Sequence, residues 1–311
     1  IYNRTDCKRR LANSTGEIQE IDMKSIKELL NNPNETNIVI GANNAMIAEI
    51  ALRAGYDGVW VSSFESHAWN LLPDANILNT ADYFDTISKI SDRIDIPILV
   101  DADEGGPSSI NTIRMVREYE KAGASAMCFE DNPSPKRCSF YGMKQSLETP
   151  ELMCGKIKAA VEKRLDPNFA IITRTESLIQ GHGHEVAMER ARMYNDAGCD
   201  AFLIHSKSKT PDEVLKFADM YHKEGLRAPL VCVPTTYNNV SIDTLRDAGF
   251  SLVIYANYSV RAAVKSIEDI FTKMHKGGSL SAANNDIVSM EKIFDLIRVD
   301  QMKANQERYG S

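Results

Sequence analysis

The chain has 311 residues, of which 43% are hydrophobic and 25% are charged, an ordinary globular composition whose length suits one large domain or two medium ones. A formal net charge of -7 excludes a broad basic surface, so nucleic acid and anionic membranes are not expected partners. The longest apolar runs fall far short of the roughly 20 residues that span a bilayer.

The first residues show no periodicity typical of a helix or a strand, and we expect residues 1–21 to form an extension outside the main domain. This segment lacks the apolar core of a secretory signal, so the expected location is cytoplasmic. The six cysteines of the chain follow no compact spacing pattern. Cys128, Cys199 and Cys232 are expected as small buried apolar residues.

Between residues 38 and 257 the chain alternates short apolar runs with segments of helical periodicity, several of which end in glycine. Runs buried on both faces are typical of parallel sheets, and eight such units indicate a closed (β/α)₈ barrel over residues 22–275, an α/β fold of TIM type. The eight runs are NIVIGA, DGVWVSS, IPILVDAD, AMCFED, FAIITRTE, AFLIHS, LVCVPTT and LVIYAN.

Residues 276–311 read as a polar hinge followed by a C-terminal helical segment. The apolar residues of that segment need a surface, either on their own barrel or on a neighbouring subunit. A helical tail after a loose hinge favours exchange between subunits.

The apolar runs become polar where each predicted strand ends. In a (β/α)₈ barrel those ends form the face that carries active sites. Ordinary capping explains one or two such residues, but not carboxylates, a guanidinium and an imidazole together. The residues are Ser62, Asp101, Asp103, Glu130, Arg174, His205, Thr235 and Asn257.

Three carboxylates in this set predict a metal site. Asp101 and Asp103 lie two apart in VDADEGG, so on a strand their side chains point to the same side, and Glu130 ends the next strand. Oxygen ligands without nearby cysteine or histidine favour Mg²⁺ with several retained waters. The alternative is capping of the following helices.

Arg174 and His205 offer cationic and hydrogen-bonding partners for an anionic substrate. An arginine in an apolar strand is costly to bury without an anionic partner, and Glu176 is the alternative internal one. His205 alone is equally compatible with a core histidine. The loop after the second strand could hold a substrate carboxylate through hydroxyl and amide groups of Trp60, Ser62, Ser63 and Phe64.

Residues 130–142, EDNPSPKRCSFYG, are polar and contain two prolines, and this connection is longer than a simple turn from strand to helix. It therefore predicts an active-site lid. Cys138 follows Arg137 and lies near Lys136, and such cations lower the pKa of a thiol. We expect a reactive cysteine if the lid closes; an exposed thiol without a role is the alternative.

The motifs together resemble the isocitrate lyase and phosphoenolpyruvate mutase superfamily, from about residue 22 to the end. The resemblance implies a (β/α)₈ barrel whose last helix swaps between subunits in a homotetramer, a dimer of dimers, with Mg²⁺ as cofactor. The motifs are GVWVSS, LVDADEG, ED at 130 and 131, PKRCS, ITRTES, LIHSK, VPTTY, IYANYSVRA and IVSMEKIF.

Within the superfamily the HSK and IYAN stretches resemble phosphoenolpyruvate mutase and phosphonopyruvate hydrolase, in which Arg174 and His205 would hold the phosphonyl group. The same resemblance places Asp74 near the transferring group. Lys136 and Ser139 match lid residues of the mutases. It also implies that Mg²⁺ is organised by Asp101, Asp103 and Glu130, and that the pyruvate carboxylate is surrounded by Trp60, Ser62, Ser63 and Phe64.

The lid departs from the mutase pattern because Asn132 replaces a lysine and Cys138 replaces an asparagine. KRC resembles the methylisocitrate and isocitrate lyases, whose cysteine protonates an enolate. The resemblance implies an Mg²⁺-dependent enzyme acting at C3 of a pyruvate-type enolate, first of all a mutase forming or breaking a P–C bond in phosphonate metabolism. The alternatives are a carbon-carbon lyase of the methylisocitrate or dimethylmalate type with Cys138 as acid, a phosphonopyruvate hydrolase, or a noncatalytic protein that binds oxo acids.

Overall fold

The structure is a computed structural model that describes residues 8–12, 18–22, 24–32, 35–143 and 145–310. The chain divides into two compact units, Ile1–Tyr258 and Ser259–Ser311. None of the helices in the described ranges is long and apolar enough to cross a membrane.

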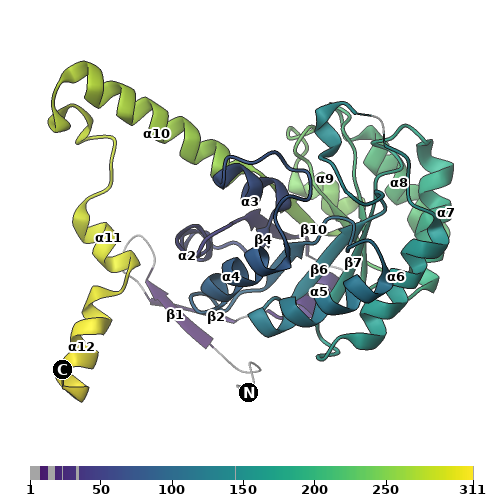
Figure 1. The fold of residues 1–311 in the computed structure, drawn as a ribbon, viewed down its shortest axis with the longest axis horizontal. Coiled ribbons are helices and arrows are strands. Elements are labelled where there is room, and N and C mark those ends of the chain that lie inside the picture. Colours follow the sequence, from purple (N-terminus) through teal and green to yellow (C-terminus); the bar gives the residue numbers. More distant parts are fainter. Residues whose placement is uncertain (1–7, 13–17, 23, 33–34, 144, 311) are drawn as a thin grey trace. The chain divides into compact units, whose positions relative to one another are not determined.

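Eight parallel strands close into a barrel in the first unit, which confirms the (β/α)₈ fold (Figure 1). Each strand pairs with its sequence neighbours, and the last strand closes the barrel against the first. The strands are β3 (Asn37–Gly41), β4 (Gly58–Val61), β5 (Ile98–Asp101), β6 (Ala126–Glu130), β7 (Ala170–Thr175), β8 (Ala201–Ile204), β9 (Leu230–Cys232) and β10 (Phe250–Tyr255).

Helices follow the strands and cover the outside of the barrel (Figure 1). The predicted glycine stops are confirmed at Gly123 and Gly198, whose φ angles of 102° and 94° end α5 and α7 in a left-handed turn that glycine adopts without strain. The helices are α2 (Ala45–Arg53), α3 (Ser63–Trp69), α4 (Thr80–Ser91), α5 (Ser109–Ala122), α6 (Pro150–Lys163), α7 (Gly183–Asp196), α8 (Asp212–Lys223) and α9 (Ile242–Asp247).

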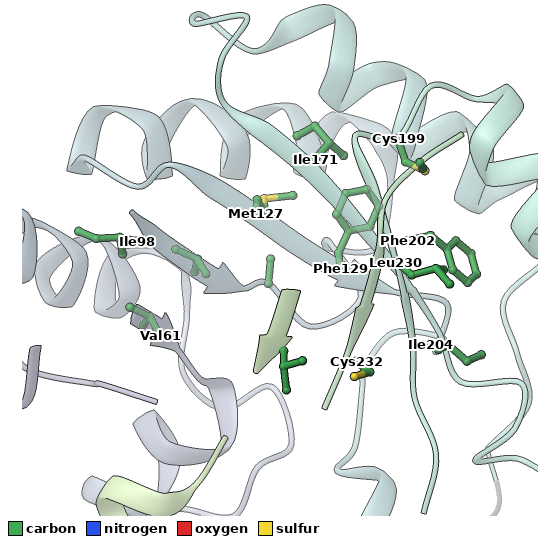
Figure 2. Close-up of a cluster of buried hydrophobic side chains, with 14 of the residues drawn as sticks. Val61, Ile98, Met127, Phe129, Ile171, Cys199, Phe202, Ile204, Leu230 and Cys232 are labelled. Carbon is green, nitrogen blue, oxygen red and sulfur yellow. The ribbon is translucent and has the colours of Figure 1, made fainter. Parts of the chain in front are cut away.

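Two apolar cores lie on the two faces of the sheet, which is why the strands read as continuous apolar runs. The outer core joins strands and helices and contains Cys199 and Cys232 (Figure 2). The inner core fills the barrel and contains Cys128 together with residues of α1 (Ile26–Asn31). All three cysteines are buried, as predicted.

Ahead of the barrel, β1 (Lys8–Ala12) and β2 (Ile18–Asp22) form a separate two-stranded antiparallel sheet. The sequence predicted no element there, because KRRLA and IQEID are mostly polar and each spans only five residues. The two strands are stabilised by pairing with each other, which the apolar and polar pattern of either segment alone does not predict.

The second unit is helical. The two compact units divide at Tyr258, so most of α10 (Tyr258–Gly277) groups with the tail, whereas the sequence placed the boundary after residue 275. The predicted hinge contains the short 3₁₀ helix η2 (Leu280–Ala283), and α11 (Met290–Leu296) and α12 (Val299–Tyr309) follow. Large apolar side chains are exposed along α10 and after it, among them Ile267, Phe271, Val288, Phe294 and Ile297.

Candidate active site

The carboxyl ends of the strands bring polar side chains together at one mouth of the barrel. Asp101 is the last residue of β5 and Glu130 the last of β6. Glu130 lies directly beside Arg174 of β7 in the sheet register, and the Arg174 Nε is 3.0 Å from Glu130 Oε2. His205 follows β8, and its Nδ1 is 2.7 Å from Arg174 Nη2. The predicted convergence of acid, guanidinium and imidazole groups is present.

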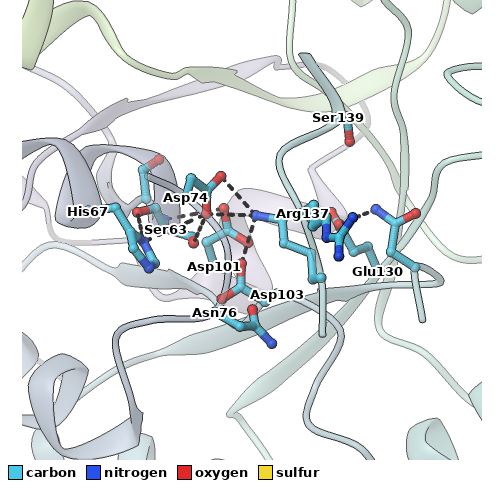
Figure 3. Close-up of polar contacts among 12 residues, drawn as sticks. Ser63, His67, Asp74, Asn76, Asp101, Asp103, Glu130, Arg137 and Ser139 are labelled. Atoms are coloured by element: carbon cyan, nitrogen blue, oxygen red, sulfur yellow. Dashed lines mark hydrogen bonds and ion pairs between the residues drawn. The ribbon is translucent and has the colours of Figure 1, made fainter. Parts of the chain in front are cut away.

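Asp103 reaches this mouth by a different route from the one expected. β5 ends at Asp101, and Asp103 lies in a turn with a left-handed φ of 50°. The argument that both carboxylates share one side of a strand is therefore wrong for Asp103. The turn nevertheless brings the carboxylates of Asp74, Asp101 and Asp103 close together (Figure 3).

Lys136 of the lid inserts its ammonium group between two of these carboxylates. Its Nζ lies 2.8 Å from Asp103 Oδ1 and 3.0 Å from Asp74 Oδ2. Burial lowers the pKa of Lys136, but the charges of Asp103 and Asp74 outweigh burial and raise that pKa well above its ordinary value. The ammonium therefore stays charged and neutralises part of the acidic cluster.

Glu176 organises the cationic side of the mouth. Its Oε1 lies 2.5 Å from Arg174 Nε and 2.8 Å from His205 Nδ1. Burial opposes ionisation of Glu176, yet Arg174 and His205 lower its pKa. Burial first, and then the charge of Arg174, lowers the pKa of His205 below its ordinary value. Glu176 is thus the internal partner that the sequence offered for Arg174, and it also contacts His205.

The lid lies against both sides of the mouth. Ser139 donates a hydrogen bond to Glu176 Oε2, and the Phe140 ring meets the His205 ring edge-on at 5.8 Å between centroids. The Cys138 amide donates to the carbonyl of Asp74 at 3.0 Å. Lys136, Cys138 and Ser139 are all buried, so the predicted lid is packed into the mouth in this structure.

Cys138 differs electrostatically from the prediction. The sequence placed it beside cations that would lower the thiol pKa, but its side chain is only 6% exposed, and burial raises the pKa to about 11. Lys136 and Arg174 oppose this rise and Asp74 adds to it, and burial outweighs the two cations. Cys138 is therefore a neutral thiol, able to donate a proton but poorly suited to act as a nucleophile.

The four residues expected around a substrate carboxylate have different local roles. Trp60 packs in the inner core of the barrel. The Ser62 hydroxyl caps α3 by accepting from the Glu65 amide, and the Ser63 hydroxyl donates to Asp74 Oδ1 at 2.9 Å. Phe64 is half-buried in the first turn of α3. Within the described part of the chain, Ser63 is the one residue of this group that is hydrogen-bonded to the acidic cluster, through Asp74 and Asp101.

Comparison with known proteins decides the family. The family model for phosphoenolpyruvate phosphomutase matches residues 26–275. The chain belongs to the phosphoenolpyruvate phosphomutase family. A phosphonopyruvate hydrolase from a Variovorax species is 36% identical over 272 residues, covering 87% of this chain and 93% of the relative. A 2,3-dimethylmalate lyase from Eubacterium barkeri is 30% identical over 280 residues, covering 87% and 92%.

Solved structures of the phosphomutase family agree. A phosphoenolpyruvate phosphomutase from Streptomyces platensis subsp. rosaceus superposes with a TM-score of 0.89 at 36% identity, covering 92% of this chain and 98% of the other. A phosphonopyruvate hydrolase in complex with oxalate and Mg²⁺ superposes with a TM-score of 0.86 at 34% identity, with the same coverage. The chain is therefore an enzyme of the phosphoenolpyruvate mutase and isocitrate lyase superfamily.

The acidic cluster of this family member fits a hard cation that keeps waters. In the ranges that the structure describes, no group of three or more His, Cys, Asp and Glu side chains is arranged to hold a metal ion, and Lys136 lies against Asp74 and Asp103. Burial raises the pKa of Asp101 to about 6 and raises that of Glu130 well above its ordinary value, so their charged forms need a compensating cation. Mg²⁺ typically uses one or two carboxylates and retains water, which suits this arrangement.

Sequence reasoning missed several polar residues of the mouth. The Asn132 amide donates to Glu130 Oε1 at 2.6 Å, and the Tyr141 hydroxyl accepts from the Asp74 amide at 2.8 Å. Beneath the lid, Asp131 accepts from Arg190 and Tyr194. The sequence marked position 131 only as part of a motif and Asn132 only as a departure from the mutase lid, although the partner of Asn132 lies two residues away. The contacts of Tyr141 and Asp131 join segments far apart in the sequence, which no local pattern reports.

Proposed function

We propose that this enzyme makes or breaks the P–C bond at C3 of phosphonopyruvate, interconverting it with phosphoenolpyruvate in phosphonate metabolism. The observation that carries the proposal is the contact of Arg174 with His205 at the mouth, where Arg174 also lies against Glu130 and Glu176. A phosphonyl group is an anion with three oxygens, and it requires a guanidinium and hydrogen-bond donors in this arrangement.

Asp101, Asp103 and Glu130 would hold Mg²⁺, which would polarise the oxygens of the oxo acid and its enolate. Ser63 stands beside Asp101, with its amide 3.4 Å from Asp101 Oδ2. We assign the carboxylate end of the substrate to the Ser63 side of the mouth, next to Trp60, Ser62 and Phe64.

In this proposal Arg174 and His205 bind the phosphonyl oxygens, and Glu176 orients both of them. Asp74 lies near the transferring group, held by Ser63 and Lys136. Lys136 compensates the charge of the enolate, and the lid, held to Glu176 by Ser139, excludes water from the reacting atoms.

A second candidate is a carbon-carbon lyase, which the neutral thiol of Cys138 favours. A thiol with a pKa of about 11 is protonated at physiological pH and can supply the proton that an enolate requires after bond cleavage. The substitution of Cys138 for the asparagine of the mutases also keeps hydrolysis of phosphonopyruvate open as a variant of the first proposal.

Incubation of the enzyme and Mg²⁺ with phosphonopyruvate, followed by ³¹P NMR, tests the proposal. We expect the phosphoenolpyruvate signal to appear, EDTA to abolish the conversion, and added Mg²⁺ to restore it. Inorganic phosphate instead of phosphoenolpyruvate would identify a hydrolase. An unchanged spectrum would exclude both P–C reactions and leave the lyase, and conversion that survives EDTA would refute the proposed roles of Asp101, Asp103 and Glu130.

We also propose that the enzyme is a homotetramer in which the C-terminal segment swaps between subunits. The support is the apolar face of α10, where Ile267 and Phe271 are exposed in the single chain. We expect sedimentation of a tetramer for the native chain and of a smaller species for Phe271→Glu, which places a charge in that face. A monomeric native chain would contradict the assembly.

A further inference from the structure

Three groups of Asp74 are held by the lid. The Asp74 amide donates to the Tyr141 hydroxyl at 2.8 Å, and the Asp74 carbonyl accepts from the Cys138 amide at 3.0 Å. The carboxylate accepts from Lys136 Nζ at 3.0 Å and 3.1 Å. The backbone and the side chain of one residue are thus bound by three residues of the lid, residues 130–142.

The loop that carries Asp74 is held at other points, where Leu72 and Leu78 donate to His67 and Asn76 donates to Glu104, and these bonds do not reach Asp74. It joins α3 to α4 without regular structure, and two of its residues, Leu71 and Asn76, have left-handed φ angles of 55°. Such angles are unfavourable for residues other than glycine and persist where surrounding contacts hold them. The hydrogen bonds that reach Asp74 from outside the loop therefore determine where its carboxylate lies.

Tyr141 is suited to this task because its ring is not part of the core. Its side chain is 43% exposed, and that of the adjacent Phe140, which contacts His205 on the opposite side of the mouth, is 47% exposed. Half-exposed aromatic residues contribute little to folding of the barrel. Tyr141 contacts Asp74 and Phe140 contacts His205, so the two aromatic residues join this segment to both sides of the mouth.

We propose that Tyr141 is a positioning residue: its hydroxyl fixes the Asp74 peptide when the lid closes and so places the Asp74 carboxylate against Lys136 and Ser63. Closure of the lid then completes a chain of hydrogen bonds and ion pairs that runs from Ser63 through Asp74 and Lys136 to Asp103. The effect on turnover rests on the proposed P–C reaction, whereas the effect on the Asp74 backbone does not. The two are separable by experiment.

The first measurement is hydrogen exchange of the Asp74 amide in Tyr141→Phe, which removes one oxygen and keeps the ring. We expect exchange to accelerate roughly three- to tenfold, the ratio that corresponds to one net hydrogen bond. The matched control is Tyr309→Phe, a highly exposed tyrosine near the end of α12, which should leave Asp74 exchange unchanged. Equal exchange in Tyr141→Phe and the native enzyme overturns the inference.

The second measurement is turnover of phosphonopyruvate by the same variants. Tyr141→Phe should lower kcat by roughly three- to tenfold with KM nearly unchanged, because substrate contacts remain while Asp74 is less well placed. The melting temperature should match that of the native enzyme. If the native enzyme converts no phosphonopyruvate, the proposed function fails and amide exchange still decides the role of Tyr141. If kcat is unchanged while the native enzyme is active, the positioning role fails by itself.

Discussion

Replacing Lys136 with methionine is expected to reduce the turnover of phosphonopyruvate by about 100- to 1000-fold, the typical cost of removing a preorganised charge from an active site. Lys136 is the lid cation that contacts both Asp74 and Asp103. Without its ammonium group the two carboxylates face each other without compensation. The enolate would then form beside uncompensated negative charge.

Turnover of Lys136→Met is measured by ³¹P NMR at saturating Mg²⁺. The control variant is Lys216→Met, which removes an exposed lysine of α8. The control should retain native turnover. Circular dichroism should show a folded barrel in both variants, because Lys136 belongs to the lid rather than to either apolar core. A Lys136→Met enzyme within about tenfold of the native rate would remove Lys136 from the proposed machinery.

Replacing Arg190 with methionine is expected to destabilise the barrel by about 3–5 kcal/mol, because it leaves a buried carboxylate unpaired. Arg190 of α7 donates to Asp131 at 3.1 Å and to the carbonyl of Glu148 at 2.9 Å. The Glu148 amide in turn donates to the Asp131 carbonyl at 2.8 Å. Arg190 therefore joins the two residues that bracket the lid connection and anchors them to the barrel.

Arg192 provides a matched control on the same helix. It is also paired with a glutamate, Glu224, but its side chain is 46% exposed. Solvent screening makes such a surface pair a weak contributor to stability, so Arg192→Met should shift the urea midpoint far less than Arg190→Met. Similar shifts for the two variants would show that the buried network under the lid is not a stabilising anchor.

Cys138 shows why charge neighbours along the sequence are an incomplete guide to reactivity. Arg137 and Lys136 are adjacent in the chain, and sequence alone suggested a lowered thiol pKa. In the folded chain Lys136 turns toward Asp74 and Asp103, and burial dominates the environment of the thiol. The desolvation of a group depends on everything packed around it, which neighbouring residues do not reveal.

Asp103 and Tyr141 show the same limit for geometry. The sequence identified Asp103 as part of the acidic cluster, but by an alternation rule that ends with β5 at Asp101. Tyr141 contacts Asp74 across 67 positions of the chain. No periodicity reports such a contact, because it depends on how the lid and the loop after α3 fold over the same mouth.

The barrel, the buried cysteines and the set of polar residues at the strand ends could all be predicted from the amino-acid sequence. Those features follow from local apolar runs, from glycine at helix stops, and from the fact that parallel strands end at one face. Only the tertiary structure decided which carboxylate Lys136 meets, that Glu176 holds Arg174 and His205 together, and that Cys138 is a neutral thiol. These depend on distances between distant segments and on burial, both of which arise only when the chain is packed.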